Sequence, residues 1–147
     1  MGQFNLRVYA LIVNEFNEIL ISDEYRYGKF FSKFPGGGVQ ANEGIREALK
    51  RELNEELGYC NTEATFFYFN ESHQASAFDN STLVAFYYII RMPKMELGKL
   101  PSYSIPFSEE QEKQRWVKLS ELLPQDLTFP IDQQVIEKFL KENLTIF

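Results

Sequence analysis

The sequence contains few of the residues that build disulfide or zinc scaffolds. Among its 147 residues there is one cysteine, Cys60, and one histidine, His73. A single cysteine excludes an internal disulfide and cannot hold zinc alone. We expect Cys60 to be a small buried residue. One histidine in a polar stretch is a weak basis for a catalytic base, so we expect His73 to lie on the surface.

Long apolar runs and an excess of positive charge are also missing. No run of 18 apolar residues occurs, which argues against a membrane span. Residues 1–6 do not have the basic and then apolar layout of a signal peptide, so we expect a cytoplasmic protein. The net charge of −6 disfavours binding to nucleic-acid backbones. A small phosphorylated substrate is still possible if a divalent cation neutralises its charge. A homodimer is also possible.

The composition is that of a folded protein, with 44% apolar and 16% aromatic residues. The length fits a single domain spanning residues 1–147. Runs of β-branched and aromatic residues predict strands, and apolar residues at helical spacing predict two helices. The expected strands are 6–13, 19–22, 60–69, 82–91 and 113–119. The expected helices are 45–57 and 131–144, with a short helical turn at 120–123 and loops at 24–29, 71–80 and 92–107. This order indicates an α+β protein.

The helix at 45–57 has an apolar stripe that includes carboxylates. At roughly 100° per residue, its apolar side chains share one face. They are Ile45, Ala48, Leu49, Leu53 and Leu57. Glu52 and Glu56 fall inside this stripe and Glu55 lies at its edge, whereas the opposite face carries Glu47, Lys50 and Asn54. A glutamate-rich helix is usually a solvated face, but that interpretation does not fit Glu52 and Glu56.

Carboxylates are rarely buried without a partner, because desolvation costs each of them several kcal/mol. Glu52, Glu55 and Glu56 also repel one another at i, i+3, i+4 spacing. A positive group must therefore lie among them. Oxygen-rich clusters of this kind suit Mg²⁺ or Mn²⁺.

The segment Gly37–Tyr59 resembles the signature of the Nudix hydrolases. The shared pattern is Gly37, Glu43, Arg51-Glu52-Leu53, Glu55-Glu56 and Gly58 at the family's spacing. The last position departs from it, since Tyr59 replaces an aliphatic residue. The resemblance implies an α/β/α sandwich with a mixed β-sheet, a signature loop and helix, and a C-terminal helix. It also implies metal-dependent hydrolysis of a pyrophosphate bond in a nucleoside diphosphate linked to another moiety.

By position in the motif, Glu52, Glu55, Glu56 and the main-chain carbonyl of Gly37 would hold Mg²⁺ or Mn²⁺. Glu43 and Arg51 would pair, with Arg51 orienting a metal-binding glutamate. A surface ion pair is the alternative for Arg51. The substrate would be a nucleotide, a nucleotide sugar, ADP-ribose or a dinucleoside polyphosphate.

The general base and the substrate contacts are less defined. Family members use either a glutamate of the signature helix or one on a distant loop. The loop candidates are Glu109, Glu110 and Glu112, which could equally form a solvated charged stretch. Arg7, Arg26 and Lys33 are candidates for phosphate contact, although solvent exposure is the usual fate of such residues. Trp116 is expected in the core or in a pocket wall.

A different class of function is a Nudix-like domain that binds a nucleotide sugar or ADP-ribose without hydrolysing it. Such domains usually lose one or more signature glutamates, and here all are present. A purely structural protein is a third alternative, and it leaves the carboxylates in the apolar stripe unexplained.

Overall fold

The computed structural model describes residues 3–60 and 63–142. Close contacts group these residues into two units. Unit 1 comprises residues 3–11 and 35–91, and unit 2 comprises residues 12–34 and 92–142. Strand β1 (Phe4–Val13) contributes its first residues to unit 1 and its last to unit 2. None of the described helices is long and apolar enough to cross a membrane.

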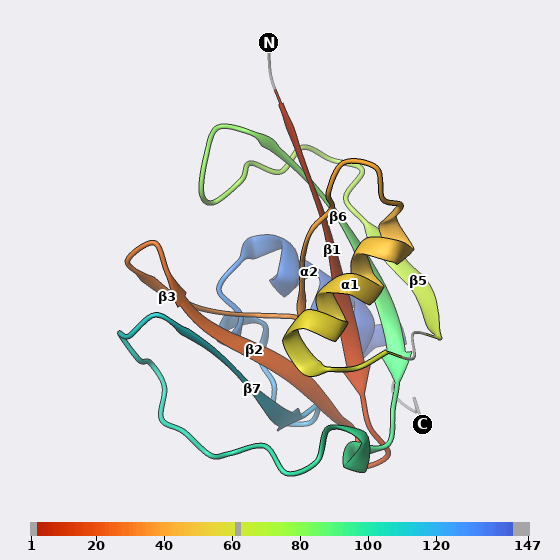
Figure 1. Cartoon of the computed structure of the whole chain (residues 1–147), viewed down its shortest axis with the longest axis vertical. Coiled ribbons are helices and arrows are strands. Elements are labelled where there is room, and N and C mark those ends of the chain that lie inside the picture. The colour runs from red at the N-terminus through yellow and green to blue at the C-terminus, as the bar shows by residue number, and fades with distance from the viewer. Residues whose placement is uncertain (1–2, 61–62, 143–147) are drawn as a thin grey trace. The chain divides into compact units, whose positions relative to one another are not determined.

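Unit 1 is a sheet with one helix lying across it (Figure 1). Besides β1, its elements are β4 (Gly36–Gly38), α1 (Ile45–Leu57), β5 (Ala64–Phe69) and β6 (Thr82–Arg91). Strand β4 pairs antiparallel with β1, placing Gly37 opposite Val8. Strand β6 neighbours β1 and points the same way, while β5 pairs antiparallel with β6 (Figure 1). The sheet is therefore mixed.

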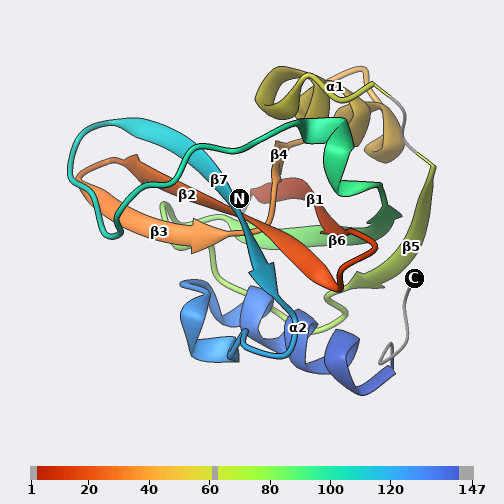
Figure 2. The same cartoon turned by 90° about the horizontal axis from the view of Figure 1, so that it is seen from below.

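Unit 2 is an antiparallel sheet centred on β2 (Glu18–Arg26), which pairs with β3 (Lys29–Lys33) and with β7 (Gln111–Lys118). Two short 3₁₀ helices, η1 (Lys94–Leu97) and η2 (Pro124–Asp126), belong to its connections. Helix α2 (Pro130–Glu142) lies on one face of this sheet (Figure 2). It buries Ile131, Val135, Ile136 and Phe139, the apolar stripe expected from the sequence.

Several boundaries differ from the sequence prediction. Residues 24–29 are not a loop, because β2 continues to Arg26 and β3 begins at Lys29 after a two-residue turn. The polar side chains of this segment remain in the sheet because they bond to one another, as described below. The glycine run 36–38, part of the expected signature loop, forms the short strand β4. A hydrogen-bonded turn lies at 119–121, close to the helical turn expected at 120–123, and the 3₁₀ helix η2 follows it.

Two burial predictions are also wrong. Cys60 is an exposed free thiol, because it follows the end of α1 and lies outside the helix's buried face. The continuous apolar run of β6 favours burial on both faces of the strand, but Leu83, Val84 and Phe86 are only partly buried. His73 is exposed, as expected.

Candidate active site

Helix α1 carries the carboxylates singled out by the sequence, and its buried face is defined by Ala48, Leu49 and Leu53. At its start, the Glu47 carboxylate accepts the Gly44 N–H at 3.0 Å, which satisfies one of the free amides of the first turn. At its end, Gly58 adopts the left-handed conformation (φ 66°) and closes the helix with backbone hydrogen bonds. The two ends fix the extent of the helix, and its buried face fixes the rotation and therefore the direction of its glutamates.

Arg51 is the centre of the polar network in unit 1. Its guanidinium donates to both Glu43 oxygens, at 2.7 and 3.0 Å, and to the Gly38 carbonyl oxygen at 2.9 Å. This two-pronged geometry is the stronger kind of charge-assisted bond. The hydrogen bond from Arg51 lowers the pKa of Glu43, and the same bond raises the pKa of Arg51. Arg51 therefore ties the glycine strand, the loop before α1 and the helix together.

Glu52 lies between Arg51 and the backbone of the glycine strand. Its Oε1 accepts from Arg51 at 3.1 Å, and its side chain is only 15% exposed. A Cβ added to Gly37 would come within 2.6 Å of the Glu52 carboxylate carbon. Glycine at position 37 is therefore required for this carboxylate to lie where it does.

The other two helix glutamates differ in exposure. Glu55 also contacts Arg51, at 3.3 Å, but its side chain is 58% exposed. Glu56 accepts the Gly36 N–H at 3.2 Å. Glu52 and Glu56 thus both face the glycine strand, whereas Glu55 lies at the edge, as the helical wheel predicts.

The donor set has the chemistry that a hard divalent cation requires. Mg²⁺ and Mn²⁺ prefer carboxylate and carbonyl oxygens. In the described part of the chain, however, no group of three or more His, Cys, Asp and Glu side chains is arranged to hold a metal. The carboxylates of Glu52 and Glu55 are paired with Arg51, and the Glu56 carboxylate accepts a hydrogen bond from the Gly36 amide. The residues fit a divalent cation chemically, and the carboxylates would reorient to bind one.

Gly37→Ala tests the contact between the glycine strand and Glu52. The new methyl group meets the mobile end of a side chain and not backbone, so we expect the fold to survive and the carboxylate to move. A misplacement of about 1 Å can cost on the order of 10²-fold in rate. The measurement is kcat for the two proteins, with circular dichroism to check folding. Gly38→Ala is the matched control, because its Cβ meets only Arg7 at an ordinary 3.5 Å. A wild-type kcat in Gly37→Ala would contradict the assignment.

Unit 2 holds a second group of charged side chains, which links the phosphate-contact candidates Arg26 and Lys33 with the loop candidate Glu112. Lys33 is buried and lies 2.8 Å from the Glu24 carboxylate. Arg26 is half-exposed and contacts Glu24 at 3.2 Å and Glu112 at 3.6 Å. Glu24 and Glu112 are directly opposite each other on β2 and β7. The structure therefore brings Arg26, Lys33 and Glu112 together around Glu24. The sequence prediction did not include Glu24 among the site residues.

Glu24 was missed because its segment was assigned to a loop. The informative signal was the polar alternation after Ile21, in which Ser22 and Glu24 share one strand face and are joined by a 3.3 Å hydrogen bond. The remaining candidates lie elsewhere. Arg7 is in unit 1 and donates to the Tyr9 hydroxyl at 2.9 Å. Glu109 and Glu110 are exposed before β7, whereas Glu112 belongs to that strand.

Burial raises the pKa of Glu112 from its ordinary value near 4.5 to about 7, and the negative charge of Glu24 adds to the shift. A carboxyl with a raised pKa in the folded protein favours folding at low pH. That contribution is complete below about pH 4.5 and is lost as the pH rises through 7. Glu112 should therefore make the protein less stable at pH 8 than at pH 5.

Glu112→Gln removes the titrating group and should flatten this pH dependence. We expect a variant with a higher Tm than wild type at pH 8 and a smaller difference at pH 5. Each kcal/mol corresponds to about 2–4 °C at this chain length. The measurement is thermal unfolding across that range, with the exposed Glu110→Gln as control. Parallel Tm–pH curves for Glu112→Gln and wild type would contradict the prediction.

The comparisons with known proteins agree with the motif. Residues 3–139 match the family model of the NUDIX domain. The chain is 29% identical over 139 residues to an 8-oxo-dGTP diphosphatase of Haemophilus influenzae, covering 91% of this chain and 90% of the relative. It is 30% identical over 118 residues to an enzyme of the same name from Buchnera aphidicola, covering 80% and 83%.

The fold class is confirmed by solved structures. A MutT NUDIX hydrolase from Burkholderia pseudomallei is similar with a TM-score of 0.68 and 26% identity, over 92% of this chain and 98% of that one. The protein is thus an α+β chain with the Nudix-like sandwich fold. It belongs to the Nudix family and is a Nudix pyrophosphohydrolase.

Proposed function

We propose that the protein hydrolyses a pyrophosphate bond in a nucleoside diphosphate derivative, with Mg²⁺ or Mn²⁺ held by Glu52, Glu55, Glu56 and the Gly37 carbonyl. The carrying observation is the position of Glu52, held by Arg51 and packed against the one residue, Gly37, that leaves room for it. Glu56 faces the same strand through its bond to the Gly36 amide. The site gathers anionic oxygen beside the backbone of the glycine strand, and carboxylate and carbonyl oxygens are what a divalent cation requires.

A divalent cation in such a site polarises phosphoryl oxygens and lowers the pKa of bound water. The residues of this chain position the carboxylates and accept the proton. Arg51 holds Glu52 in place and, through Glu43 and Gly38, fixes the helix to the loop and strand that face it. The partial burial of Glu52 keeps competing water away from the carboxylate. Glu55, which is largely exposed, is the carboxylate most accessible to a solvent molecule and is our candidate to accept a proton.

Two relatives are named 8-oxo-dGTP diphosphatases. This supports nucleoside triphosphates as the first substrate class to test, with release of pyrophosphate. The exposed thiol of Cys60 is compatible with the reducing cytoplasm that we propose as the location.

The test is a product-release screen with and without Mg²⁺ and Mn²⁺. Its substrates are nucleoside triphosphates including 8-oxo-dGTP, dinucleoside polyphosphates, ADP-ribose and nucleotide sugars. We expect metal-dependent turnover of at least one class. Tight binding of one of these compounds without product would contradict hydrolysis and favour a sensing domain. Turnover that persists in a chelator would contradict the metal assignment.

A further inference from the structure

Strands β5 and β6 of unit 1 expose a row of aromatic rings. Phe66 and Phe69 of β5 are 46% and 40% exposed, and Phe86 of β6 is partly buried beside them. The ring centroids of Phe69 and Phe86 lie 5.7 Å apart, and those of Phe66 and Phe69 lie 6.2 Å apart. We call these three residues the aromatic edge. Exposed apolar side chains that contact one another are typical of interaction surfaces.

A β-bulge places the three rings on one face of the sheet. Side chains three residues apart on a regular strand point to opposite faces. Here the pairing of β5 with β6 shifts between Phe66 and Tyr68, so that Phe66 lies opposite Tyr88 and Phe69 lies opposite Phe86. Tyr88 and Phe86 share a face of β6 because they are two residues apart, and Phe66 and Phe69 therefore share it as well.

Strand β5 carries little of the protection that edge strands usually have. It is the last strand in the order of the sheet, next to β6 (Figure 1). Exposed edges are commonly protected by charged residues or proline, and Ala64–Phe69 contains neither. Because the bulge interrupts regular pairing, we expect side chains and not the main chain to contact a partner.

The charges at the two ends of the β5–β6 pair have opposite sign. At the end where β6 finishes lie the exposed side chains of Arg46, Glu63 and Arg91. Arg46 is held there because its guanidinium donates to the main chain at the start of β5 at 2.7 Å. At the other end, the loop that joins the two strands carries the exposed carboxylates of Glu71 and Asp79. Two arginines and one glutamate make the first end positive, and two carboxylates make the second end negative.

A second copy of this chain is complementary to this surface. In a dimer with two-fold symmetry, both copies contribute the same surface. If β5 of one copy runs antiparallel to β5 of the other, the positive end of each copy lies beside the negative end of its partner. A parallel arrangement would place like charges together, which is unfavourable.

We propose that the protein forms a homodimer in which the two aromatic edges pack against each other. At both ends of the interface, Arg91 lies near Glu71 of the partner subunit. The sequence leaves a homodimer possible, and the aromatic edge supplies the surface for it. The proposal concerns assembly and does not depend on the proposed function of the helix glutamates.

Sedimentation velocity over a range of protein concentrations measures this dimer directly. We expect wild type to dimerise with a Kd below about 100 µM. Phe66→Asp places a charge in the apolar centre of the interface and should raise the Kd at least about tenfold. Phe16→Asp is the matched control, because Phe16 is 65% exposed in unit 2, and its Kd should equal that of wild type. Circular dichroism checks that each variant is folded.

Charge exchange tests the antiparallel orientation and leaves the aromatic rings unchanged. Arg91→Glu and Glu71→Lys should each raise the Kd at least about threefold, since each change occurs twice in a two-fold interface. The double variant restores opposite charges across the interface, so its Kd should return to the wild-type value. This comparison decides the matter even if Phe66→Asp does not fold.

Four results would overturn the proposal. The first is a wild type that remains monomeric up to about 100 µM. The second is an unchanged Kd in folded Phe66→Asp. The third is a loss of the dimer in Phe16→Asp as large as in Phe66→Asp. The fourth is a double charge variant that dimerises no more tightly than Arg91→Glu and Glu71→Lys alone.

Discussion

Glu56→Gln should reduce turnover by about 10³-fold or more while the protein remains folded. The substitution preserves shape, and the amide oxygen of glutamine can still accept the Gly36 N–H that Glu56 accepts at 3.2 Å. Only the negative charge is lost. Preorganised electrostatic groups in active sites are commonly worth 10²–10³-fold each, and a metal ligand at the reacting group is expected to reach the upper end.

The measurement is kcat with saturating Mg²⁺ on the best substrate of the screen, together with Tm. Glu47→Gln is the control on the same helix, because Glu47 lies on the exposed face and its amide oxygen can keep the bond to the Gly44 amide. We expect Glu47→Gln to retain wild-type activity. Full activity in Glu56→Gln would contradict the assignment of Glu56 to the active site.

Arg51→Ala should have the second largest effect, through the orientation of Glu52. Removal of the guanidinium leaves Glu43 and Glu52 without their cation and frees the Gly38 carbonyl. We expect a loss of about 10²-fold in kcat and a lower Tm, because both the helix position and the carboxylate are released. Arg51→Lys keeps the charge but cannot make the two-pronged contact with Glu43, so its activity should be intermediate.

A double-mutant cycle distinguishes a positioning role from a simple surface ion pair. Glu43→Gln, Arg51→Ala and the double variant are compared for kcat and Tm. If Arg51 acts through the network, the two changes should be strongly non-additive in kcat. Additive and small effects in both measurements would show that the Arg51–Glu43 pair is an ordinary surface contact.

The sequence predicts α1 well, and it also predicts that carboxylates fall within the apolar stripe of this helix. Both features depend on local spacing. The apolar stripe, the Gly58 terminus and the inward direction of Glu52 and Glu56 follow from helix geometry over 13 residues. The partner of these carboxylates is harder to predict. A cation was expected among them, and the structure places Arg51 there, so the protein can hold Glu52 and Glu55 before any metal binds.

The sequence does not predict the polar interior of unit 2, because its contacts are long-range. Asp23 and Glu24 look like loop residues until β3 and β7 are placed on either side of β2. Asp23 then gains Ser32, Tyr103 and Arg115 as donors, from positions up to 92 residues away. Buried charge of this kind depends on satisfied partners, which no local pattern reveals.

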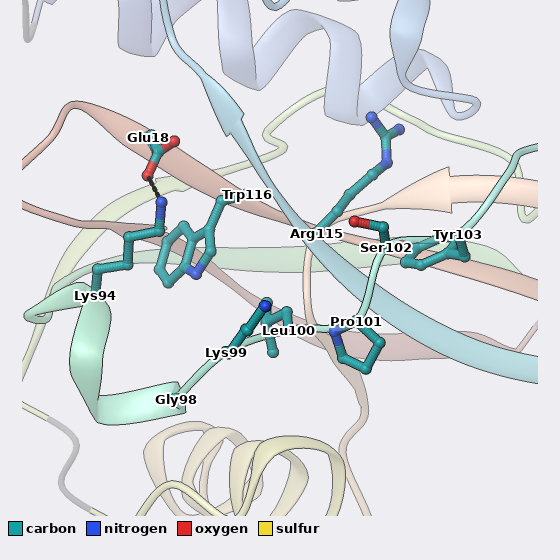
Figure 3. Close-up of a pocket in the computed structure, with 10 residues that line it drawn as sticks. All are labelled: Glu18, Lys94, Gly98, Lys99, Leu100, Pro101, Ser102, Tyr103, Arg115 and Trp116. Atoms are coloured by element: carbon teal, nitrogen blue, oxygen red, sulfur yellow. Dashed lines mark ion pairs between the residues drawn. The ribbon is translucent and has the colours of Figure 1, made fainter.

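The position of Trp116 depends on long-range contacts in the same way. A tryptophan in a strand is expected in the core or in a pocket wall, and the path of residues 98–103 places Trp116 in the wall of a pocket (Figure 3). Cys60 shows the converse error, because a small apolar residue after a helix can lie outside every buried face.

The central claim is that the carboxylates on the buried side of α1 hold a divalent cation. The most direct test is a Mn²⁺ titration followed by the electron paramagnetic resonance of the free ion, for wild type, Glu52→Gln, Glu56→Gln and Glu47→Gln. We expect wild type and Glu47→Gln to bind equally, and the other two at least about tenfold more weakly. Equal Mn²⁺ affinity in all four proteins would contradict the claim.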